Sequence, residues 1–234
     1  MKKTILWLVL IGFSPLQTTA TTAAEIAARL EERLRALQTL QARFSQVYYG
    51  QPPALPLREK GLFYFQKPDR MRWRYEEPEP KEYLYQEGTF SSYFPEDNQL
   101  IIQKLSGEYH ETEILLILAG QKSLREDYDL ELVPASATGK GGVWTLKLKP
   151  RAEEEASSEI LLEVDAGSRL IRRIVFRDWA GNSSEFVFQD LKADRKLDPG
   201  LFELRVPDDC EIIRDEALSP PGKQTKSPAV RIPQ

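Results

Sequence analysis

The sequence predicts a mainly β protein, an antiparallel barrel or sandwich that follows one amphipathic helix. Short segments with alternating apolar and polar residues recur along most of the chain, and turn-forming residues separate them. The clearest segment lies within residues 60–78, where Met71, Trp73 and Tyr75 alternate with arginines and therefore point to one face of a strand. Pro68 and Asp69 precede this strand and favour a turn that joins it to the strand before.

The first predicted element is a helix over residues 25–47. Its apolar residues recur at spacings of three and four, as on the buried face of an amphipathic helix: Ile26, Leu30, Leu34, Leu37 and Phe44. Residues 42–49 also alternate as a strand does, so the sequence leaves the end of this helix open.

Strands are predicted in two sets, one on each side of a short apolar helix over residues 111–119, which Gly120 ends. The first set comprises residues 58–66, 70–75, 82–86, 89–94 and 99–105. The second set comprises residues 127–133, 143–149, 159–164, 170–177, 184–191 and 202–206. So many short strands with turns between them are typical of one antiparallel β domain.

The two ends of the chain predict segments outside that domain. Residues 1–20 have a basic start, a short apolar run and a small-residue exit, which predict a secretory signal peptide with cleavage as late as residue 24. Residues 21–216 form the predicted domain, and residues 217–234 have the composition of a disordered tail. No cysteine comes directly after the apolar run, where a lipid would be attached, so we expect an exported protein without a lipid anchor.

Charge and composition exclude several functions. Removal of residues 1–20 takes away two lysines and moves the net charge from −4 to −6, which disfavours binding to nucleic acid. Cys210 is the single cysteine and is predicted to be a buried, inert thiol; His110 is the single histidine. The sequence has no phosphate loop, zinc motif or nucleophile elbow, so we expect neither an enzyme nor a cofactor.

Several motifs occur in an order that resembles the LolA family of periplasmic lipoprotein carriers. The motifs are F-x-Q at 44–46, K-P-x-x-M-x-W-x-Y at 67–75, an aromatic hairpin at 90–95, D-x-x-G-N at 178–182 and F-x-[FL]-x-x-P at 202–207. The resemblance extends from about residue 24 to residue 215. Many relatives have Trp in the aromatic hairpin where this chain has Ser91 and Ser92.

The resemblance implies an incomplete, strongly curved antiparallel β-barrel, with an amphipathic N-terminal helix and short helices that form a lid. It also implies a periplasmic carrier that holds the acyl chains of lipoproteins and moves them from the inner to the outer membrane. The implied partners are acylated lipoproteins, an inner-membrane ABC-type exporter, and an outer-membrane acceptor lipoprotein or the membrane itself. We expect a monomer.

The candidate site has an apolar and a basic part. We predict that acyl chains contact Phe63, Phe65, Met71, Trp73, Tyr83, Tyr85, Phe90, Leu115 and Leu118. The resemblance places Met71 near the mouth, where it should stay partly wet, so that Met71→Glu should harm cargo handling more than stability. It assigns Lys67 to lid closure and cargo transfer, with weaker hydrogen bonding than the arginine found in some relatives.

Other interpretations remain open from the sequence. Large aromatic residues usually fill cores, so the same side chains could form an ordinary protein interior. Lys67 could be only a turn residue. On the same fold, a lipid- or lipoprotein-sensing periplasmic module, or a carrier of another acylated lipid, would use the same apolar face. A secreted hydrolase is the remaining class, and the single His110 argues against it.

Overall fold

The computed structural model describes most of the predicted domain: residues 21–104, 116–120, 122–134, 141–151, 159–177 and 180–215. Three predictions lie outside these residues, namely the signal peptide, most of the short apolar helix with Leu115, and the tail over residues 217–234. Of the short helix, residues 116–118 are described and are helical. Gly120 follows them at a φ of +68°, which confirms the predicted glycine stop.

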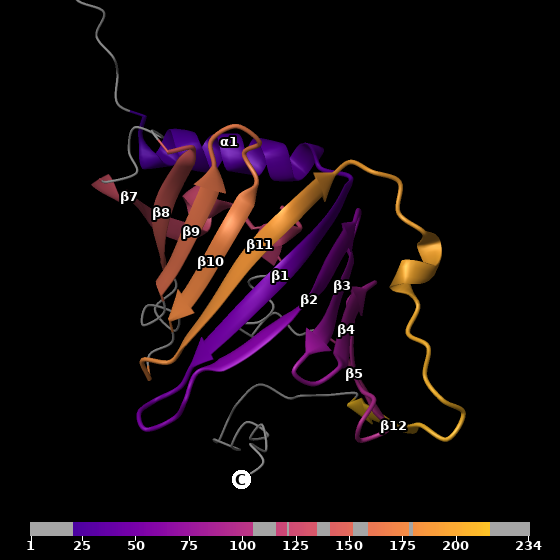
Figure 1. Cartoon of the computed structure of the whole chain (residues 1–234). Coiled ribbons are helices and arrows are strands. Elements are labelled where there is room, and N and C mark those ends of the chain that lie inside the picture. Colours follow the sequence, from indigo (N-terminus) through magenta and orange to yellow (C-terminus); the bar gives the residue numbers. More distant parts are fainter. Residues whose placement is uncertain are drawn as a thin grey trace, which may run out of the picture.

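Within the described ranges, twelve strands form one sheet in the order β12-β6-β5-β4-β3-β2-β1-β11-β10-β9-β8-β7. The strands are β1 Thr39–Tyr49, β2 Leu57–Gln66, β3 Arg70–Glu77, β4 Lys81–Gln86, β5 Thr89–Phe94, β6 Gln99–Lys104, β7 Tyr128–Leu132, β8 Val143–Pro150, β9 Glu159–Asp165, β10 Ile171–Arg177, β11 Ser183–Ala193 and β12 Glu211–Asp215. All neighbours pair antiparallel except β12 and β6, which pair in parallel. The sheet curls into an open barrel, as predicted (Figure 1).

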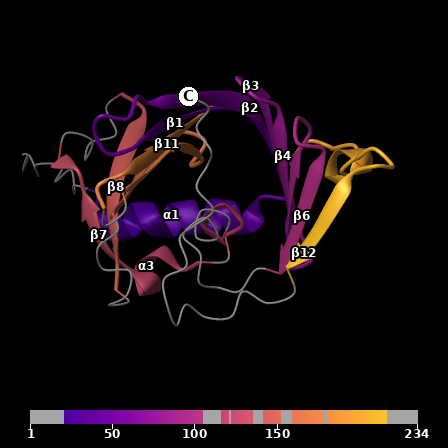
Figure 2. The same cartoon turned by 90° about the horizontal axis from the view of Figure 1, so that it is seen from below.

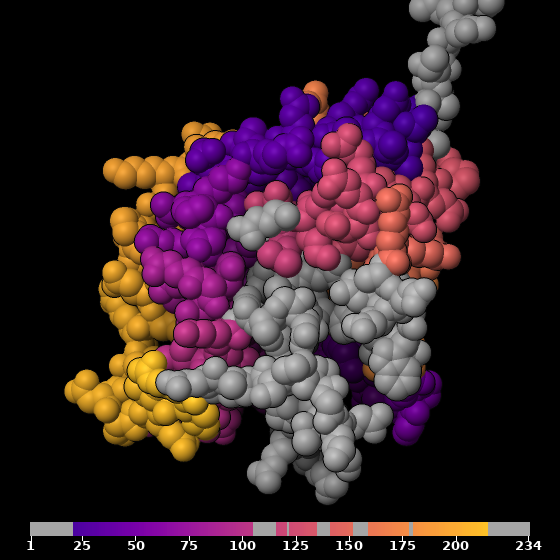
Figure 3. All heavy atoms as spheres, turned by 180° about the vertical axis from the view of Figure 1, so that it is seen from behind, coloured from indigo at the N-terminus to yellow at the C-terminus, as the bar shows by residue number. Residues whose placement is uncertain are grey.

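Helix α1, Ala23–Ala36, lies across the concave side of the curl between its two arms (Figure 2). Thr22 and Glu25 form a capping box at its start. Its buried residues include Ile26, Leu30 and Leu34, which face the core as their spacing predicts. The helix α3, Leu124–Asp127, and residues 116–120 pack beside α1 on this side of the molecule (Figure 3). We call α1, residues 116–120 and α3 the lid.

The predicted helix over residues 25–47 is too long. α1 ends at Ala36, and the following residues form β1, which pairs with β2 on one side and β11 on the other. The Asp194 carboxylate accepts hydrogen bonds from Gln38 N at 2.8 Å and from Arg33 Nη2 at 3.0 Å, and these bonds lower the pKa of Asp194. Pairing on both edges therefore decides between the helix and strand patterns that coexist in this segment.

The predicted strand over residues 202–206 is wrong. The chain there forms the 3₁₀ helix η3, Pro199–Phe202, followed by irregular backbone. Arg72 Nη1 donates to the backbone carbonyls of Leu201 at 2.6 Å and Glu203 at 3.3 Å. The Arg72 side chain therefore binds carbonyl groups that, in a strand, would accept hydrogen bonds from the backbone of a neighbouring strand. The last strand, β12, was not predicted.

The apolar residues form two clusters on opposite faces of the sheet. The larger cluster fills the concave side between the sheet and the lid. The smaller cluster lies on the outer face, where Phe202 of the η3 segment packs on Tyr64 and Leu84. This arrangement explains why β2 is apolar on both faces. Cys210 is half-buried rather than buried, which corrects the prediction made from the sequence.

Candidate functional site: the concave face and its lid

The aromatic residues predicted to contact acyl chains on β2, β3 and β4 lie on one face of the sheet. Phe63 pairs directly with Trp73, and Trp73 pairs with Tyr83 on the next strand. Directly opposed residues in antiparallel strands point to the same side of a sheet. Met71 similarly lies between Phe65 and Tyr85. The register therefore confirms the shared face that alternation along each strand predicts.

The burial of these residues divides them into two groups. Phe63, Phe65, Met71, Trp73 and Leu118 are buried, with exposed fractions of 0–6%. The second group is half-buried at the edge of the same core and lies on β4 and β5: Tyr83, Tyr85 and Phe90. The half-buried group therefore keeps some exposed surface, whereas the first group has almost none.

Met71 is not a partly wet residue at a mouth. Its exposed fraction is 0%, and it belongs to the main core. β3 lies between β2 and β4, and Phe65 and Tyr85 flank Met71 on the concave face. The premise that Met71 stays partly wet is therefore wrong, and the effect of Met71→Glu on stability becomes the new prediction.

Trp73 is the centre of an aromatic cluster on the concave face. Its ring centroid lies 4.4 Å from that of Phe63 and 5.0 Å from that of Phe44. Across the curl it lies 5.4 Å from Phe186 and 5.8 Å from Phe188, both on β11. Such ring pairs contribute about 0.5–1.5 kcal/mol each beyond the area that they bury. The cluster holds strands β1, β2, β3 and β11 together.

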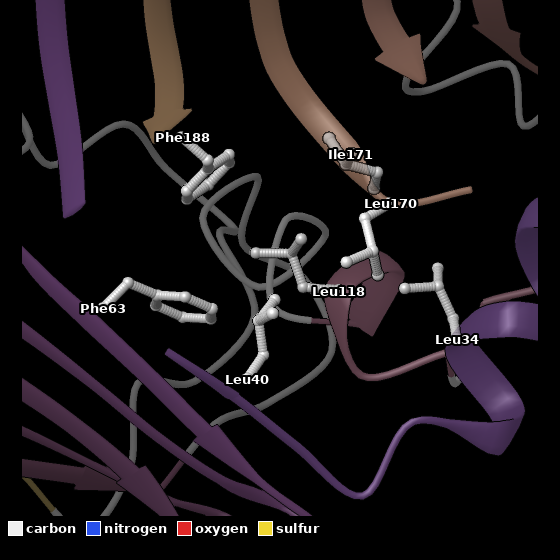
Figure 4. A pocket seen from close by; sticks show the side chains of 7 residues that line it. All are labelled: Leu34, Leu40, Phe63, Leu118, Leu170, Ile171 and Phe188. Atoms are coloured by element: carbon white, nitrogen blue, oxygen red, sulfur yellow. The ribbon is translucent and has the colours of Figure 1, made fainter. Parts of the chain in front are cut away.

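The space between the lid and the sheet is small in the described part of the chain. A cavity of about 10 Å³ lies between the lid and the sheet, near the lower limit for one water molecule. Figure 4 shows the seven side chains that line it: Leu34, Leu40, Phe63, Leu118, Leu170, Ile171 and Phe188. All of them are apolar, and they come from α1, the sheet, residues 116–120 and the turn before β10. The cavity as it stands is too small for a ligand larger than about one water molecule.

Lys67 connects the sheet to the lid. It lies in the turn between β2 and β3, and its ammonium group donates to the carbonyl of Arg35 in the last turn of α1. Its backbone N–H also donates to the carbonyl of Gln38 at 2.9 Å. Carbonyls in the last turn of a helix have no partner within the helix, and a cation there is favoured by the helix dipole. The geometry supports a closing role for Lys67, which stays a prediction.

A second polar contact joins α1 to α3 and was missed from the sequence. Glu31 is 4% exposed, and its carboxylate accepts from Arg125 Nε at 2.9 Å and from Arg125 N at 3.2 Å. Arg35 lies 3.9 Å from the same carboxylate. The spacing in the sequence could have revealed this contact. Glu31 lies one residue after Leu30 and four after Ala27, so it falls on the buried side of α1.

Loss of the Glu31 contacts should loosen the lid. Glu31→Ala leaves Arg125 without this carboxylate, and we expect the free energy of unfolding to fall by about 1–2 kcal/mol, since Arg125 is half-exposed and its ion pair is partly screened. Hydrogen exchange should quicken in residues 124–127. The control is Glu32→Ala on the exposed side of α1, whose effect should stay within about 0.5 kcal/mol. Equal effects of both changes would contradict a lid contact at Glu31.

The described residues contain no cluster of three or more His, Cys, Asp or Glu side chains that could hold a metal ion. No helix in the described part of the chain is long and apolar enough to cross a membrane.

The fold and the site together define a half-barrel whose apolar concave face is closed by a helical lid. The chain belongs to the LolA family, "Outer membrane lipoprotein carrier protein LolA", whose family model matches residues 35–205. This finding confirms the resemblance seen in the motifs.

Curated relatives named outer-membrane lipoprotein carrier protein match most of this chain, and two of them serve as examples. The one from Methylococcus capsulatus is 28% identical over 189 residues, which is 81% of this chain and 88% of the relative. The one from Pseudomonas syringae pv. tomato is 24% identical over 188 residues, 80% of this chain and 87% of the relative. Among solved structures, an uncharacterized conserved protein from Thermus thermophilus matches with a TM-score of 0.53 and 18% identity, over 82% of this chain and 99% of that one. That likeness concerns the fold.

Proposed function

We propose that this protein is a periplasmic carrier, not an enzyme, that binds the acyl chains of lipoproteins and moves them from the inner to the outer membrane. The observation that carries the proposal is the closed apolar interior, in which a lid packs apolar side chains against an aromatic face and adds a few polar contacts. The names of the curated relatives support lipoproteins as the cargo. The proposed partners are an inner-membrane ABC-type exporter and an outer-membrane acceptor lipoprotein or the membrane itself.

The physical chemistry of acyl chains is consistent with this arrangement. Each CH₂ group gains about 0.8 kcal/mol when it leaves water, so a cargo with several chains needs a large apolar surface during transit. A permanent cavity of that size would be costly, because unfilled interior space destabilises a protein. An interior that closes on itself when empty, and opens to the cargo, avoids both problems.

The proposal is tested by purifying the protein from periplasm and identifying its bound molecules by mass spectrometry. We expect acylated lipoproteins, and we expect crosslinked cells to yield an ABC-type exporter. Recovery of another acylated lipid would change the cargo. Recovery of a periplasmic regulatory protein, with no lipoprotein, would favour the sensing module instead.

Replacement of Lys67 tests the closing contact. Lys67→Leu removes the donor to the Arg35 carbonyl and should shift the protein toward the open state, with impaired loading or delivery of cargo and an intact fold. A hydrogen bond from a charged donor contributes about 1.5–3 kcal/mol when sheltered, and less at this partly exposed position. The measurement is transfer of a labelled lipoprotein to acceptor membranes. Lys67→Arg is the control and should transfer normally or close more tightly. Normal transfer by Lys67→Leu would leave Lys67 as a turn residue.

A further inference from the structure

A polar cluster lies on the concave face at the end of the sheet that points away from α1. Its members are Gln46, Glu59, Tyr75, Lys81 and Ser184. β1 leads away from the end of α1 along the curl, and Gln46 lies toward its far end (Figure 1). The register places Tyr75 and Lys81 opposite each other and Gln46 opposite Glu59. Since Tyr75 shares its strand face with Trp73, this cluster continues the apolar lining of the interior.

Hydrogen bonds connect the cluster. Lys81 Nζ lies 2.5 Å from Glu59 Oε1 and 4.6 Å from the centre of the Tyr75 ring. The Tyr75 hydroxyl donates to Gln46 Oε1 at 2.6 Å, and Gln46 Nε2 donates to Ser184 Oγ at 3.4 Å. Glu59 is 6% exposed and Tyr75 is 7% exposed. Burial raises the pKa of Tyr75 well above its ordinary value, so its hydroxyl remains a neutral donor.

The position of this ion pair is unusual within the protein. Among strand-to-strand ion pairs with both partners in the described ranges, Glu59–Lys81 is the one on the concave face; pairs such as Lys60–Glu77 lie on the outer face. A buried ion pair is often no more stabilising than well-packed apolar side chains of similar size. Stability therefore gives no reason for a charged pair at the end of an apolar lining.

The concave face thus changes character along its length. Next to α1 it is aliphatic and aromatic, with Leu40, Phe65 and Met71 buried. At the far end it offers hydrogen-bond donors. Lys81 has three N–H donors, and within the described part of the chain its ammonium makes one hydrogen bond, to Glu59. An acylated cargo likewise has an apolar part and a polar end. Its hydrocarbon chains end in ester and amide carbonyls, which need hydrogen-bond donors when they leave water.

On the basis of the proposed function, we infer that Lys81, held by Glu59 and assisted by Gln46 and Ser184, binds the ester and amide carbonyls of the cargo. The chains then extend from this subsite with their methyl ends toward α1. The carboxylate of Glu59 neutralises Lys81, so the subsite suits neutral carbonyl groups better than the carboxylate of a free fatty acid. These residues determine how deep the chains lie and favour esterified over free chains.

Binding by matched variants tests the subsite. The probes are a synthetic tripalmitoylated cysteinyl peptide, and 1-N-phenylnaphthylamine, which has no ester or amide group. The double variant Glu59→Gln/Lys81→Met removes both charges together and leaves neither one buried alone. It should bind the lipopeptide about tenfold more weakly and the apolar dye as before. The double variant Lys60→Met/Glu77→Gln, which removes an exposed pair from the outer face, should bind both probes like the original protein.

Crosslinking of the unaltered protein tests the orientation independently of any substitution. A lipopeptide with a photoreactive group at its cysteinyl head should mark residues near Lys81, and one with the group at the chain end should mark residues near Phe65 and Leu118. Reversed labelling, or equal loss of both probes by Glu59→Gln/Lys81→Met, would overturn the inference while leaving the carrier function standing. Failure of the unaltered protein to bind the lipopeptide at all would overturn both.

Discussion

Met71→Glu should lower the free energy of unfolding by about 3–5 kcal/mol, the range for an uncompensated charge in a protein interior. Met71 has no exposed surface, and its neighbours on the concave face are Phe65 and Tyr85. Neither of them carries a positive charge that could pair with a new carboxylate. Denaturant unfolding at pH 7 measures the effect.

The loss should depend on pH in a definite direction. Burial disfavours the charged form, so the carboxyl group of Met71→Glu should have a folded-state pKa above the value of about 4.3 in the unfolded chain. The penalty is then largest above the folded-state pKa, and it decreases as the pH falls through that value and the group becomes neutral. The stability deficit relative to the original protein should be smaller at pH 5 than at pH 7.

Two controls accompany this substitution. Met71→Leu conserves volume and polarity and should cost less than about 1.5 kcal/mol. Arg70→Glu places the same carboxylate one residue earlier, on the outer face of β3, and should have a small effect. If Met71→Glu is as stable as the original protein but transfers cargo poorly, the result would support the first expectation, in which Met71 is partly exposed to water near the opening.

The strands and their inward faces were predictable because they depend on short-range alternation. Alternation fixes which side chains share a face within one strand, as for Met71, Trp73 and Tyr75, and the register between strands then joins these faces. The pairing of β2 to β6 was also predictable, because these consecutive strands are joined by short turns and lie side by side in sequence order. The family motifs supplied the curvature and the lid, which alternation cannot.

Long-range partners decided what the sequence could not. Residues 37–47 have the spacing of a helix, but residues 39–49 form a strand because they pair with β11, whose residues lie more than a hundred positions further along the chain. Phe202 looked like a strand residue but covers the outer face near Arg72 and Tyr64. Gly61 was unremarkable in the sequence, yet a Cβ there would lie 2.0 Å from the Arg74 carbonyl oxygen.

The candidate site shows the same division. Alternation along the strands identified an apolar face but could not tell which aromatic residues the lid covers, since that depends on where α1 and residues 116–120 lie. The Arg35 carbonyl that receives Lys67 is a backbone atom and leaves no trace in the sequence. The polar members of the concave face, such as Glu59 and Lys81, became visible only when β2 and β4 were placed around β3.

Trp73→Ala should distinguish a cargo-binding cluster from an ordinary core. Removing the ring leaves space between Phe44, Phe63 and Phe186, and should lower the free energy of unfolding by about 3–5 kcal/mol. If acyl chains pack against this cluster, the protein that remains folded should also bind a tripalmitoylated lipopeptide more weakly. Thermal unfolding and fluorescence displacement measure the two effects separately.

The matched control is Trp144→Ala, which removes another nearly buried tryptophan, on β8 in the other arm of the curl. Its ring lies under Arg29 of α1, and the ring contacts of the Trp73 cluster do not include it. Trp144→Ala should therefore lose a comparable amount of stability and retain lipopeptide binding. If both variants keep their binding, Trp73 only supports the fold and acyl chains do not reach the cluster. If both lose binding in proportion to stability, the effect follows from unfolding; selective loss with Trp73→Ala places the acyl chains against the aromatic face.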